Sequence, residues 1–511
     1  MPLVRHPEYS WSLEETWLFE AILECYLPLL EVLTSLARQG VNPHPALVVS
    51  PTLLAMLGDD FMLARFDQYL EQLLDFCHRL ARHYAKDGAR SALVEFYRER
   101  FRRLRKTFFV DWGGDLPRAW SDLERHGRLE LLTTALTHAY LPLLESFPGC
   151  ARLQIEGGLL MHQAVFGRRP AGFWLPECGF TPRLGRLLKQ AGAEYTIVEG
   201  HGLLLGRPRP PYGVFAPVRC PDGLAVFARE PTVSLEIWSR RSGYPTHPLY
   251  REFFRDLAGE VEPELRGGFA LPAGAFRPSG VKIYAVGGEG AQKPFYRPQQ
   301  ALRQARVHAR KFVENRRRQF RRLRLYLPSP LVLAPYDAEL FGHWWYEGPQ
   351  FLEEVWRRSA GQRDFLLESP GSFLSRIGEA YVSCPEVSSW GAGGYHQVWL
   401  SRSNDWILPM VERAWRALLI ARRKQPQAHR QLRQALRELL LAQSSDWPFM
   451  IFWDRQAQYA EGRLRDHLSA AEKLLQGRTG DDFLEERARR WPFPPDWLAD
   501  RLLDLLADET G

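Results

Sequence analysis

The chain has 511 residues, of which 45% are hydrophobic and 25% are charged, and its formal net charge is +7. This length allows two or more domains with at least one large core, and the composition is that of a globular protein rather than a disordered or fibrous one. A charge of +7 spread over so many residues is weak evidence for a polyanionic partner. The function must therefore be sought in local motifs.

Cysteine usage and apolar segments limit the compartment and the cofactors. The six cysteines, at positions 25, 77, 150, 178, 220 and 384, are scattered without a CxxC pair. This spacing predicts neither a disulfide framework nor a zinc site. The first residues lack the apolar segment of a signal peptide, and no apolar run is long enough to cross a membrane. We expect a cytoplasmic protein with no metal, no cofactor and no membrane partner.

The first part of the chain is predicted to be helical. Residues 12–85 carry apolar side chains at helical spacing, and residues 86–125 continue the pattern. A short strand is predicted at 129–134, after which strands and helices alternate. Alternation of this kind favours a parallel sheet, either open or closed into a barrel.

Two basic runs, at 98–106 and 316–324, stand out from this background. In the first, Phe101 and Leu104 interleave with the arginines at helical spacing, which indicates a solvated face on a helix that buries its other side. A nucleic-acid-binding protein would more often carry a recognisable module beside such charge. We therefore expect no nucleic-acid partner.

The motif GFWLPECGF places a carboxylate, Glu177, directly after an apolar strand. Thr181 suits an N-cap, and a helix at 182–191 is predicted to end at Gly192. A second strand is predicted at 195–198. Glu177 would then lie at the carboxyl end of a strand, which is where catalytic side chains of α/β barrels are found.

A segment rich in proline and glycine, residues 199–222, follows this unit and includes Tyr212. It is either a plain surface loop or a lid, since long loops in compact domains are often functional. Because it directly follows the Glu177 unit, it could cover the same face of the sheet.

A second carboxylate, Asp337, follows a predicted buried strand at 331–334. Two carboxylates at the ends of separate strands could meet across one cleft, as glycoside cleavage requires. Their separation would be roughly 5–5.5 Å in a retaining enzyme and roughly 6.5–9.5 Å in an inverting one. Taken singly, either acid could instead cap a helix or pair with an arginine.

Two later segments have side chains suited to a sugar. Residues 388–399 combine tryptophans with a glycine run and polar groups, and residues 444–449 contain Asp446, which could accept hydroxyl hydrogen bonds or simply cap a helix. Aromatic faces with a polar rim are typical of carbohydrate sites. From about residue 405 onward the pattern is entirely helical.

Taken together, these motifs resemble glycoside hydrolase family 57, and within it the 1,4-α-glucan branching enzymes. GFWLPECGF resembles the family's nucleophile motif, APYDAELFGHWWYEGP its acid/base motif and SSWGAGGYHQVWL its aromatic glucan-binding motif. The resemblance implies that Glu177 is the nucleophile and Asp337 the acid/base. It also implies substrate-binding roles for Arg229, Gly243, Trp390, Asp446, Trp238, Trp399, Tyr212 and His138.

The fold implied by the resemblance is α/β, an incomplete (β/α)7 barrel with a small inserted loop region and a C-terminal helical domain. The catalytic barrel is expected at residues 1–375, with the loop insertion at 199–222. The helical domain is expected at 376–511 and would include the aromatic glucan-binding segment 388–400.

The activity implied by the resemblance is retaining transglycosylation on glycogen or an amylose-like α-glucan. Asp337 protonates the leaving oxygen while Glu177 forms a covalent glucosyl-enzyme, and the 6-hydroxyl of an acceptor glucan then completes an α-1,6 branch. An α-amylase or 4-α-glucanotransferase of the same family is the nearest alternative. A glucan-binding protein with impaired catalysis is a further one.

Two departures from the family pattern bear on these expectations. The chain begins inside the family's opening His-x-His-Leu-Pro motif, so the first barrel strand is expected to be absent. Glu236 stands where relatives favour a neutral glutamine, and its added carboxylate is expected to disturb the charge near Arg229.

Overall fold

The computed structural model describes residues 1–288 and 293–508. Within them, one sheet has the strand order β1-β2-β3-β4-β6-β5-β7. The strands are β1 (Ala46–Val48), β2 (Glu130–Thr134), β3 (Gly172–Trp174), β4 (Tyr195–Val198), β5 (Val218–Arg219), β6 (Ala225–Ala228) and β7 (Tyr381–Val382). The first four and β6 are parallel, while β5 runs antiparallel to β6 and parallel to β7. This parallel-dominated sheet confirms the predicted α/β class and is consistent with an incomplete barrel.

Helices dominate the part of the chain before β2, as predicted. One long helix runs as α1 (Leu13–Ala21), the π-turn η1 (Ile22–Tyr26) and α2 (Leu27–Arg38). It is followed by α3 (Pro51–Leu57), α4 (Asp60–His83), α5 (Gly88–Lys106), the π-turn η2 (Thr107–Asp111) and α6 (Leu116–Arg125). The helical prediction for residues 12–85 missed β1, because a three-residue strand is too short to show a period of its own.

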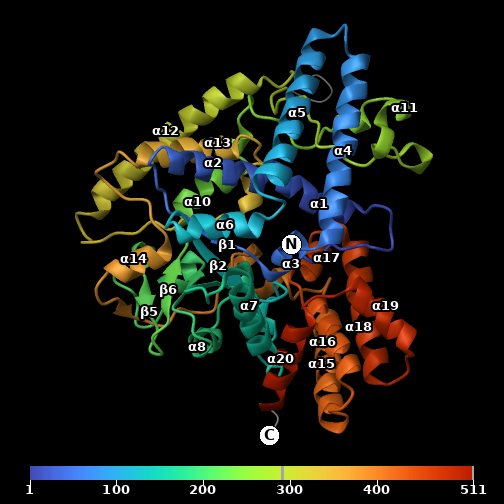
Figure 1. Cartoon of the computed structure of the whole chain (residues 1–511). Coiled ribbons are helices and arrows are strands. Elements are labelled where there is room, and N and C mark those ends of the chain that lie inside the picture. Colours follow the sequence, from blue (N-terminus) through green and yellow to red (C-terminus); the bar gives the residue numbers. More distant parts are fainter. Residues whose placement is uncertain (289–292, 509–511) are drawn as a thin grey trace.

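The basic run at 98–106 lies on α5, where its arginines face solvent and form ion pairs. Phe101 and Leu104 are buried, while Arg103 and Arg105 bond acids of the neighbouring helices. Helices α4 and α5 form a hairpin that projects from the rest of the molecule (blue in Figure 1).

The unit around Glu177 folds as the sequence predicts. Helix α8 (Pro182–Gln190) begins after Thr181, whose hydroxyl accepts the Leu184 amide, and ends before Gly192, which has a φ of +94°. Helix α7 (Cys150–Phe166) connects β2 to β3. Helix α8 in turn connects β3 to β4. Because β3 and β4 are parallel and adjacent, β3, α8 and β4 form a strand–helix–strand crossover.

The proline- and glycine-rich segment is more ordered than a plain loop. It contains α9 (Gly200–Leu204), the 3₁₀ turn η5 (Gly213–Phe215) and strand β5. The His201 Nε2 atom is 2.9 Å from the Gly394 carbonyl oxygen, so this segment contacts the predicted aromatic glucan-binding segment.

The predicted strand at 331–334 is not formed. Leu331 donates its amide to the Phe215 carbonyl at 2.8 Å, and the Leu333 carbonyl accepts from the Glu230 amide at 2.9 Å. These two bonds go to different segments and do not make a ladder, although they hold the segment beside the end of β6. The apolar run therefore indicated a segment packed beside the sheet, but the prediction of a strand was wrong.

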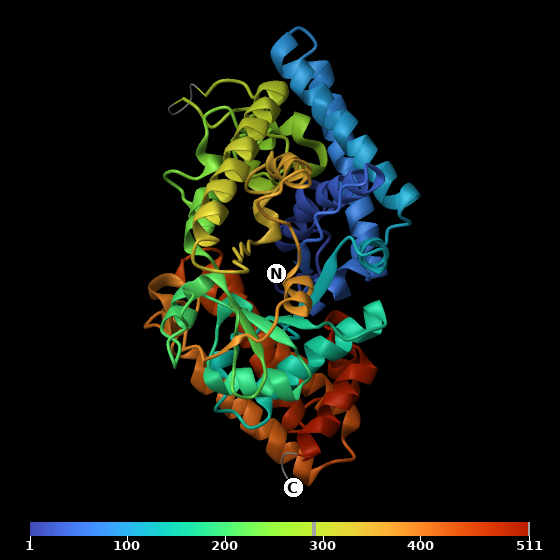
Figure 2. The ribbon, with the colours of Figure 1, turned by 90° about the vertical axis from the view of Figure 1, so that its left-hand side faces the viewer.

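The middle of the chain lies between β6 and β7. Its helices are α10 (Pro231–Trp238), α11 (Pro263–Arg266), α12 (Pro298–Leu323), α13 (Gly348–Ser359) and α14 (Pro370–Arg376). Short 3₁₀ turns join them: η6 (Tyr244–Thr246), η7 (Leu257–Gly259), η8 (Gly267–Phe269), η9 (Pro272–Gly274) and η10 (Ala338–Leu340). Helices α12 and α13 pack side by side (Figures 1 and 2).

The C-terminal part is helical, as predicted. It consists of α15 (Ile407–Lys424), α16 (His429–Ala442), α17 (Asp446–Phe452), α18 (Ala457–Leu475), α19 (Asp481–Arg490) and α20 (Asp496–Asp508). These helices, orange to red in Figures 1 and 2, lie against the sheet and α7, on the side away from the tip of the α4–α5 hairpin. In the described part of the chain, none of the helices has the length and apolar character of a membrane span.

Candidate functional site

The carboxyl ends of four parallel strands each lead into a polar side chain. His138 follows β2, Glu177 follows β3, Glu199 follows β4 and Arg229 follows β6. Because parallel strands end at the same edge of a sheet, the topology brings these side chains together. Asp337 joins them from the segment held beside the end of β6.

Glu177 is held by hydrogen bonds from two distant segments. The Trp390 indole Nε1 donates to Oε2 at 2.8 Å, and the Ser445 hydroxyl donates to Oε1 at 3.0 Å. The Glu177 carbonyl also accepts the Trp390 amide at 3.0 Å. Both Glu177 and Cys178 have positive φ, 61° and 53°, which is uncommon for non-glycine residues and concentrates at functional sites. The side chain is thus fixed in one orientation.

Burial raises the pKa of Glu177, and the charge of Asp446 adds to this, while the hydrogen bonds from Trp390 and Ser445 act in the opposite direction. His138 lies 4.0 Å from Glu177, measured from Nδ1 to Oε1. Burial lowers the pKa of His138 to about 4, so at neutral pH its ring is uncharged and the contact is not an ion pair. The His138 Nδ1 atom instead lies 2.9 Å from the Ser445 hydroxyl.

Asp337 is exposed by area, yet its pKa is raised to about 7. Desolvation of its carboxyl group by the surrounding protein is the largest cause, followed by the charges of Glu339 and Glu177. A carboxyl group with this pKa is protonated in a substantial fraction of molecules near neutral pH. The effect of the Glu177 charge on Asp337 shows that the two carboxyl groups interact electrostatically.

Arg229 contacts both an acid of the site and the aromatic segment. Its guanidinium bonds Glu199 at 2.7 Å and lies over the Trp390 ring, 5.7 Å from the centroid. Its positive charge also lowers the pKa of Asp337. Glu199 thus balances a cation whose charge acts on Asp337.

The predicted aromatic residues differ in what they present to the cleft. Trp390 is half-buried and packs edge-on against Trp174 at 5.1 Å. Trp399 is buried and its ring stacks on Tyr140, with the ring centroids 4.1 Å apart. It therefore packs inside the aromatic segment and has no free ring face for a sugar.

Of the other predicted binding residues, Asp446 acts electrostatically on Glu177. Asp446 begins α17 and accepts a hydrogen bond from Ser444 at 2.8 Å. Trp238 ends α10 and is partly exposed, while Gly243 is buried in the following turn, where a side chain would collide with the Ile237 and Ser239 carbonyls. Tyr212 is exposed just before η5.

The expected effect of Glu236 on Arg229 is not seen. The Glu236 carboxylate bonds Arg316 at 2.5 Å and accepts from the Tyr244 hydroxyl at 2.8 Å and from the Asn315 amide at 3.2 Å. Its charge is therefore neutralised on α12, whereas Arg229 pairs with Glu199. The sequence could not reveal this, because Glu236 and Arg316 are far apart along the chain.

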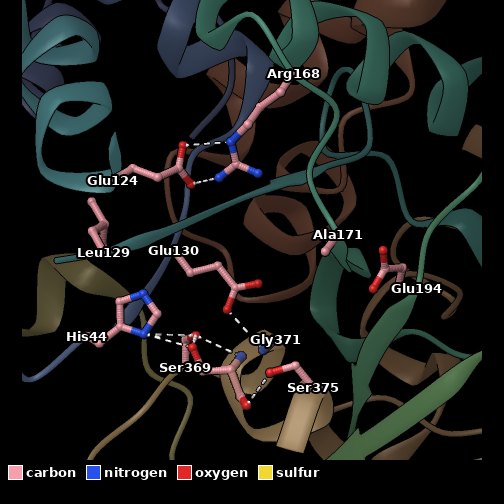
Figure 3. Close-up of a pocket in the computed structure, with 11 residues that line it drawn as sticks. His44, Glu124, Leu129, Glu130, Arg168, Ala171, Glu194, Ser369, Gly371 and Ser375 are labelled. Atoms are coloured by element: carbon pink, nitrogen blue, oxygen red, sulfur yellow. Dashed lines mark hydrogen bonds and ion pairs between the residues drawn. The ribbon is translucent and has the colours of Figure 1, made fainter. Parts of the chain in front are cut away.

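A recess of about 320 Å³ lies at the opposite, amino-terminal edge of the sheet (Figure 3). Glu130 at the start of β2 accepts from the Tyr195 hydroxyl at 2.8 Å and from the Gly371 amide at 3.0 Å, and Glu124 pairs with Arg168. Glu130 thus ties β2 to β4 and to helix α14. The side chains predicted to be functional do not line the recess.

Three contributors to the site were missed by sequence reasoning. Ser445 lies inside the SSDWPF motif but was not singled out, and Glu199 and Glu339 were passed over. Glu199 had a usable signal, because it follows β4 directly, as Arg229 follows β6. Nothing in the sequence could show that Ser445 bonds Glu177. No set of three or more acidic, histidine or cysteine side chains within the described residues is arranged to hold a metal.

Comparisons with known proteins agree with this geometry. The sequence profile of glycosyl hydrolase family 57 matches residues 1–376, and the profile of the 1,4-alpha-glucan branching enzyme C-terminal region matches residues 407–494. The 1,4-alpha-glucan branching enzyme TK1436 of Thermococcus kodakarensis is 31% identical over 90% of this chain and 69% of its own length. The probable 1,4-alpha-glucan branching enzyme Rv3031 of Mycobacterium tuberculosis is 31% identical over 91% of this chain and 88% of its own.

Solved structures show the same similarity in three dimensions. The alpha-amylase AmyC from Thermotoga maritima has a TM-score of 0.89 and 31% identity, covering 98% of this chain and 97% of that one. The branching enzyme of Pyrococcus horikoshii has a TM-score of 0.85 and 27% identity, covering 99% and 94%. The two neighbours thus carry different activities on closely similar frames.

Proposed function

Because the chain belongs to glycosyl hydrolase family 57, we propose that it is a 1,4-α-glucan branching enzyme acting by a retaining mechanism. The observation that carries the proposal is the hydrogen bond from Ser445 to Glu177. Ser445 belongs to the region that matches the branching-enzyme C-terminal profile, so that region contacts the residue that we propose as the nucleophile. The curated relatives described above bear the same activity in their names.

Glu177 is proposed as the nucleophile. Its two oxygens accept from Trp390 and Ser445, which favours the ionised form that must attack the anomeric carbon. Because the donors come from different segments, the carboxylate is oriented before substrate arrives. Attack breaks the α-1,4 bond and forms a covalent glucosyl-enzyme.

Asp337 is proposed as the acid/base. With a pKa raised to about 7, it can hold a proton for the leaving glycosidic oxygen. After the leaving chain departs, the same carboxylate removes the proton from the 6-hydroxyl of an acceptor chain. That hydroxyl attacks the glucosyl-enzyme, which releases Glu177 and creates an α-1,6 branch.

Transfer rather than hydrolysis requires that water be kept from the covalent intermediate. We propose that Arg229, Trp390, Asp446 and His138 contact the glucan near the bond that is cleaved. Trp238, Gly243 and Tyr212 would contact it further out, and Trp399 would act by supporting the aromatic segment. Tyr212 would cover the cleft when a glucan is bound.

We also propose that the catalytic barrel comprises residues 1–375 and the helical domain residues 376–511. A cytoplasmic location is proposed from the scattered cysteines of the sequence, which show no pairing pattern. The partner is an α-glucan, and neither a nucleic acid nor a membrane is expected.

The test is the linkage of the product. Purified protein is incubated with linear amylose, the product is treated with a debranching enzyme, and the released chains are counted. New chains released only after debranching, with little rise in reducing ends before it, are expected. The Glu177→Gln variant serves as the inactive control. Absence of released chains would contradict the proposal.

An α-amylase is the second candidate, favoured by the structural similarity to AmyC. It would raise reducing ends in the same assay without creating α-1,6 linkages. The two activities share Glu177 and Asp337 and differ only in what attacks the intermediate, so the assay separates them without new variants.

A further inference from the structure

The π-turn η1 interrupts the long helix 13–38 opposite the acid/base loop. It spans Ile22–Tyr26, and the Leu27 amide bonds the Ile22 carbonyl across it. A π-turn adds one residue to a helical turn and rotates the side chains that follow, and such turns are frequent at functional sites. The sequence motifs assigned no role to this segment, although it packs directly on η10.

Contacts from η1 fix the loop that carries Asp337. The Cys25 thiol lies 2.9 Å from the Ala338 carbonyl oxygen, and the Tyr26 hydroxyl donates to Glu339 Oε1 at 2.5 Å. On the other side, Gly342 has a φ of +126°, and any side chain there would collide with the Glu24 carbonyl. The loop and the π-turn are therefore in contact along their backbones as well as their side chains.

Glu339 lies two residues after Asp337, in the 3₁₀ turn η10, and its charge acts on Asp337. Its charge raises the pKa of Asp337 more than that of Glu177 does, after the larger effect of desolvation. Arg229 and the Met1 amino group act in the opposite direction. Glu339 itself faces the Tyr26 hydroxyl and the Cys25 thiol on η1.

Glu24, within the π-turn, contacts His343. Their side chains are 3.0 Å apart, and Glu24 also bonds Arg251 at 2.5 Å. Because the Glu24 carboxylate pairs with Arg251, Glu339 is the carboxylate of the Asp337 loop that the π-turn holds through Tyr26.

We propose that Glu339, anchored by the Tyr26 hydroxyl, is a positioning residue: it holds the turn that follows Asp337 against the π-turn and keeps a carboxylate beside the proposed acid/base group. The π-turn ends at Tyr26 and orients its side chain toward Glu339. The inference rests on the proposed function for its catalytic meaning, but the effect of Glu339 on Asp337 can be measured independently of activity.

The direct test is the titration of Asp337 by infrared difference spectroscopy, with Asp337→Asn as the spectrum to subtract. Glu339→Gln keeps the shape and can still accept from Tyr26 while losing the charge. We expect Asp337 to lose its proton at lower pH in Glu339→Gln than in the wild type. Tyr26→Phe is expected to move it in the same direction by less. An unchanged or higher titration midpoint in Glu339→Gln would overturn the inference.

The kinetic test is the pH dependence of kcat/KM on amylose. The alkaline limb should move to lower pH in Glu339→Gln, and each pH unit of movement lowers activity on the alkaline side about tenfold. Activity at acidic pH should change much less. A merely structural role would lower activity equally at every pH.

Glu353→Gln is the matched control, because it removes the same charge from an exposed ion pair with Arg357 on α13. Its Asp337 titration should equal that of the wild type. If the wild type shows no activity on any α-glucan, the proposed function fails, and the infrared comparison still decides the role of Glu339. Thermal unfolding checks that each variant is folded.

Discussion

Glu177 and Asp337 are both carboxylic acids, but their surroundings differ in hydrogen-bond donors. Glu177 accepts from Trp390 and Ser445, whereas Asp337 lies beside Glu339 and receives no comparable side-chain hydrogen bond within the described residues. The two hydrogen bonds stabilise the charged form of Glu177 against the effect of burial, whereas the neighbouring charge of Glu339 adds to the effect of burial on Asp337. This difference supports the opposite roles proposed for the two groups.

We predict that Glu177→Gln and Asp337→Asn each lower kcat on amylose by about a thousandfold or more. Both replacements keep the side-chain shape, so the melting temperature should change little. An α-glucosyl fluoride separates the two roles, because fluoride leaves without protonation. Asp337→Asn should still form the glucosyl-enzyme from it, and Glu177→Gln should not. Formation of that intermediate by Glu177→Gln would exclude Glu177 as the nucleophile.

Ser445 connects the helical region to Glu177, and its loss should be measurable. In Ser445→Ala, Glu177 loses one donor and His138 loses its hydroxyl partner. A hydrogen bond to a charged group contributes about 1.5–3 kcal/mol, so kcat/KM should fall by roughly tenfold to a hundredfold. Ser403→Ala, an exposed serine in the same region, is the control. Equal activities of the two variants would contradict the role given to Ser445.

At the scale of elements, the close approach of the π-turn to the loop that carries Asp337 depends on Gly342. Gly342→Ala places a methyl group against the Glu24 carbonyl and requires a φ of +126°, so we expect a loss of roughly 2–4 kcal/mol in unfolding free energy. Gly462→Ala, inside α18 with open space around it, should instead stabilise by about 0.5–1 kcal/mol. Denaturant unfolding measures both. A neutral Gly342→Ala would mean that the loop can move away from the helix.

Elements with strong local signals were predictable from the sequence. Helix α8 has a capping threonine, a proline at its first position and a terminal glycine, and its bounds match the prediction closely. Strand β1 has only three residues, and the segment 331–334 is apolar without forming a ladder. In both cases tertiary contacts decide the secondary structure, and these leave no local trace in the sequence.

The site was predictable where it follows the ends of strands. Glu177 could be located because it comes directly after β3, and Asp337 because it ends an apolar segment. Partners from distant segments, such as Ser445 and Tyr26, could not, since a contact across hundreds of residues has no periodic signature. The burial of Trp399 was hidden for the same reason: its partner Tyr140 lies on the β2 side of the site.

At the scale of the whole molecule, the two ends of the chain are packed together. Arg463 bonds the Leu3 carbonyl at 3.1 Å, His6 lies 2.9 Å from the Tyr459 hydroxyl, and Arg490 bonds Glu8 at 2.5 Å. The buried Glu438 carboxylate holds His467 and Arg487 inside the same helical region. The part of the chain that supplies Ser445 is therefore anchored to the N-terminal segment as well as to the sheet.

Buried histidines make the stability of the whole molecule sensitive to acid. His162 on α7 is fully buried, and neither ring nitrogen has a hydrogen-bond partner in the described part of the chain. Burial, aided by the charge of Arg168, lowers its pKa from 6.5 to about 3. Below pH 6.5 the unfolded chain therefore binds a proton that the folded protein does not, so stability falls as the pH drops from about 6.5 to about 3.

We predict that His162→Met removes this one contribution. The melting temperature at pH 7.5 should be equal to or above that of the wild type, and the advantage should widen as the pH falls to 4.5. The unfolding free energy of the wild type should lose up to about 1.4 kcal/mol per pH unit more than that of the variant over this range. His138 and His467 keep their own lowered pKa values, about 4 each, so acid sensitivity is reduced rather than abolished. His83→Gln, at an exposed histidine, should run parallel to the wild type, and a parallel curve for His162→Met would show that His162 is protonated in the fold.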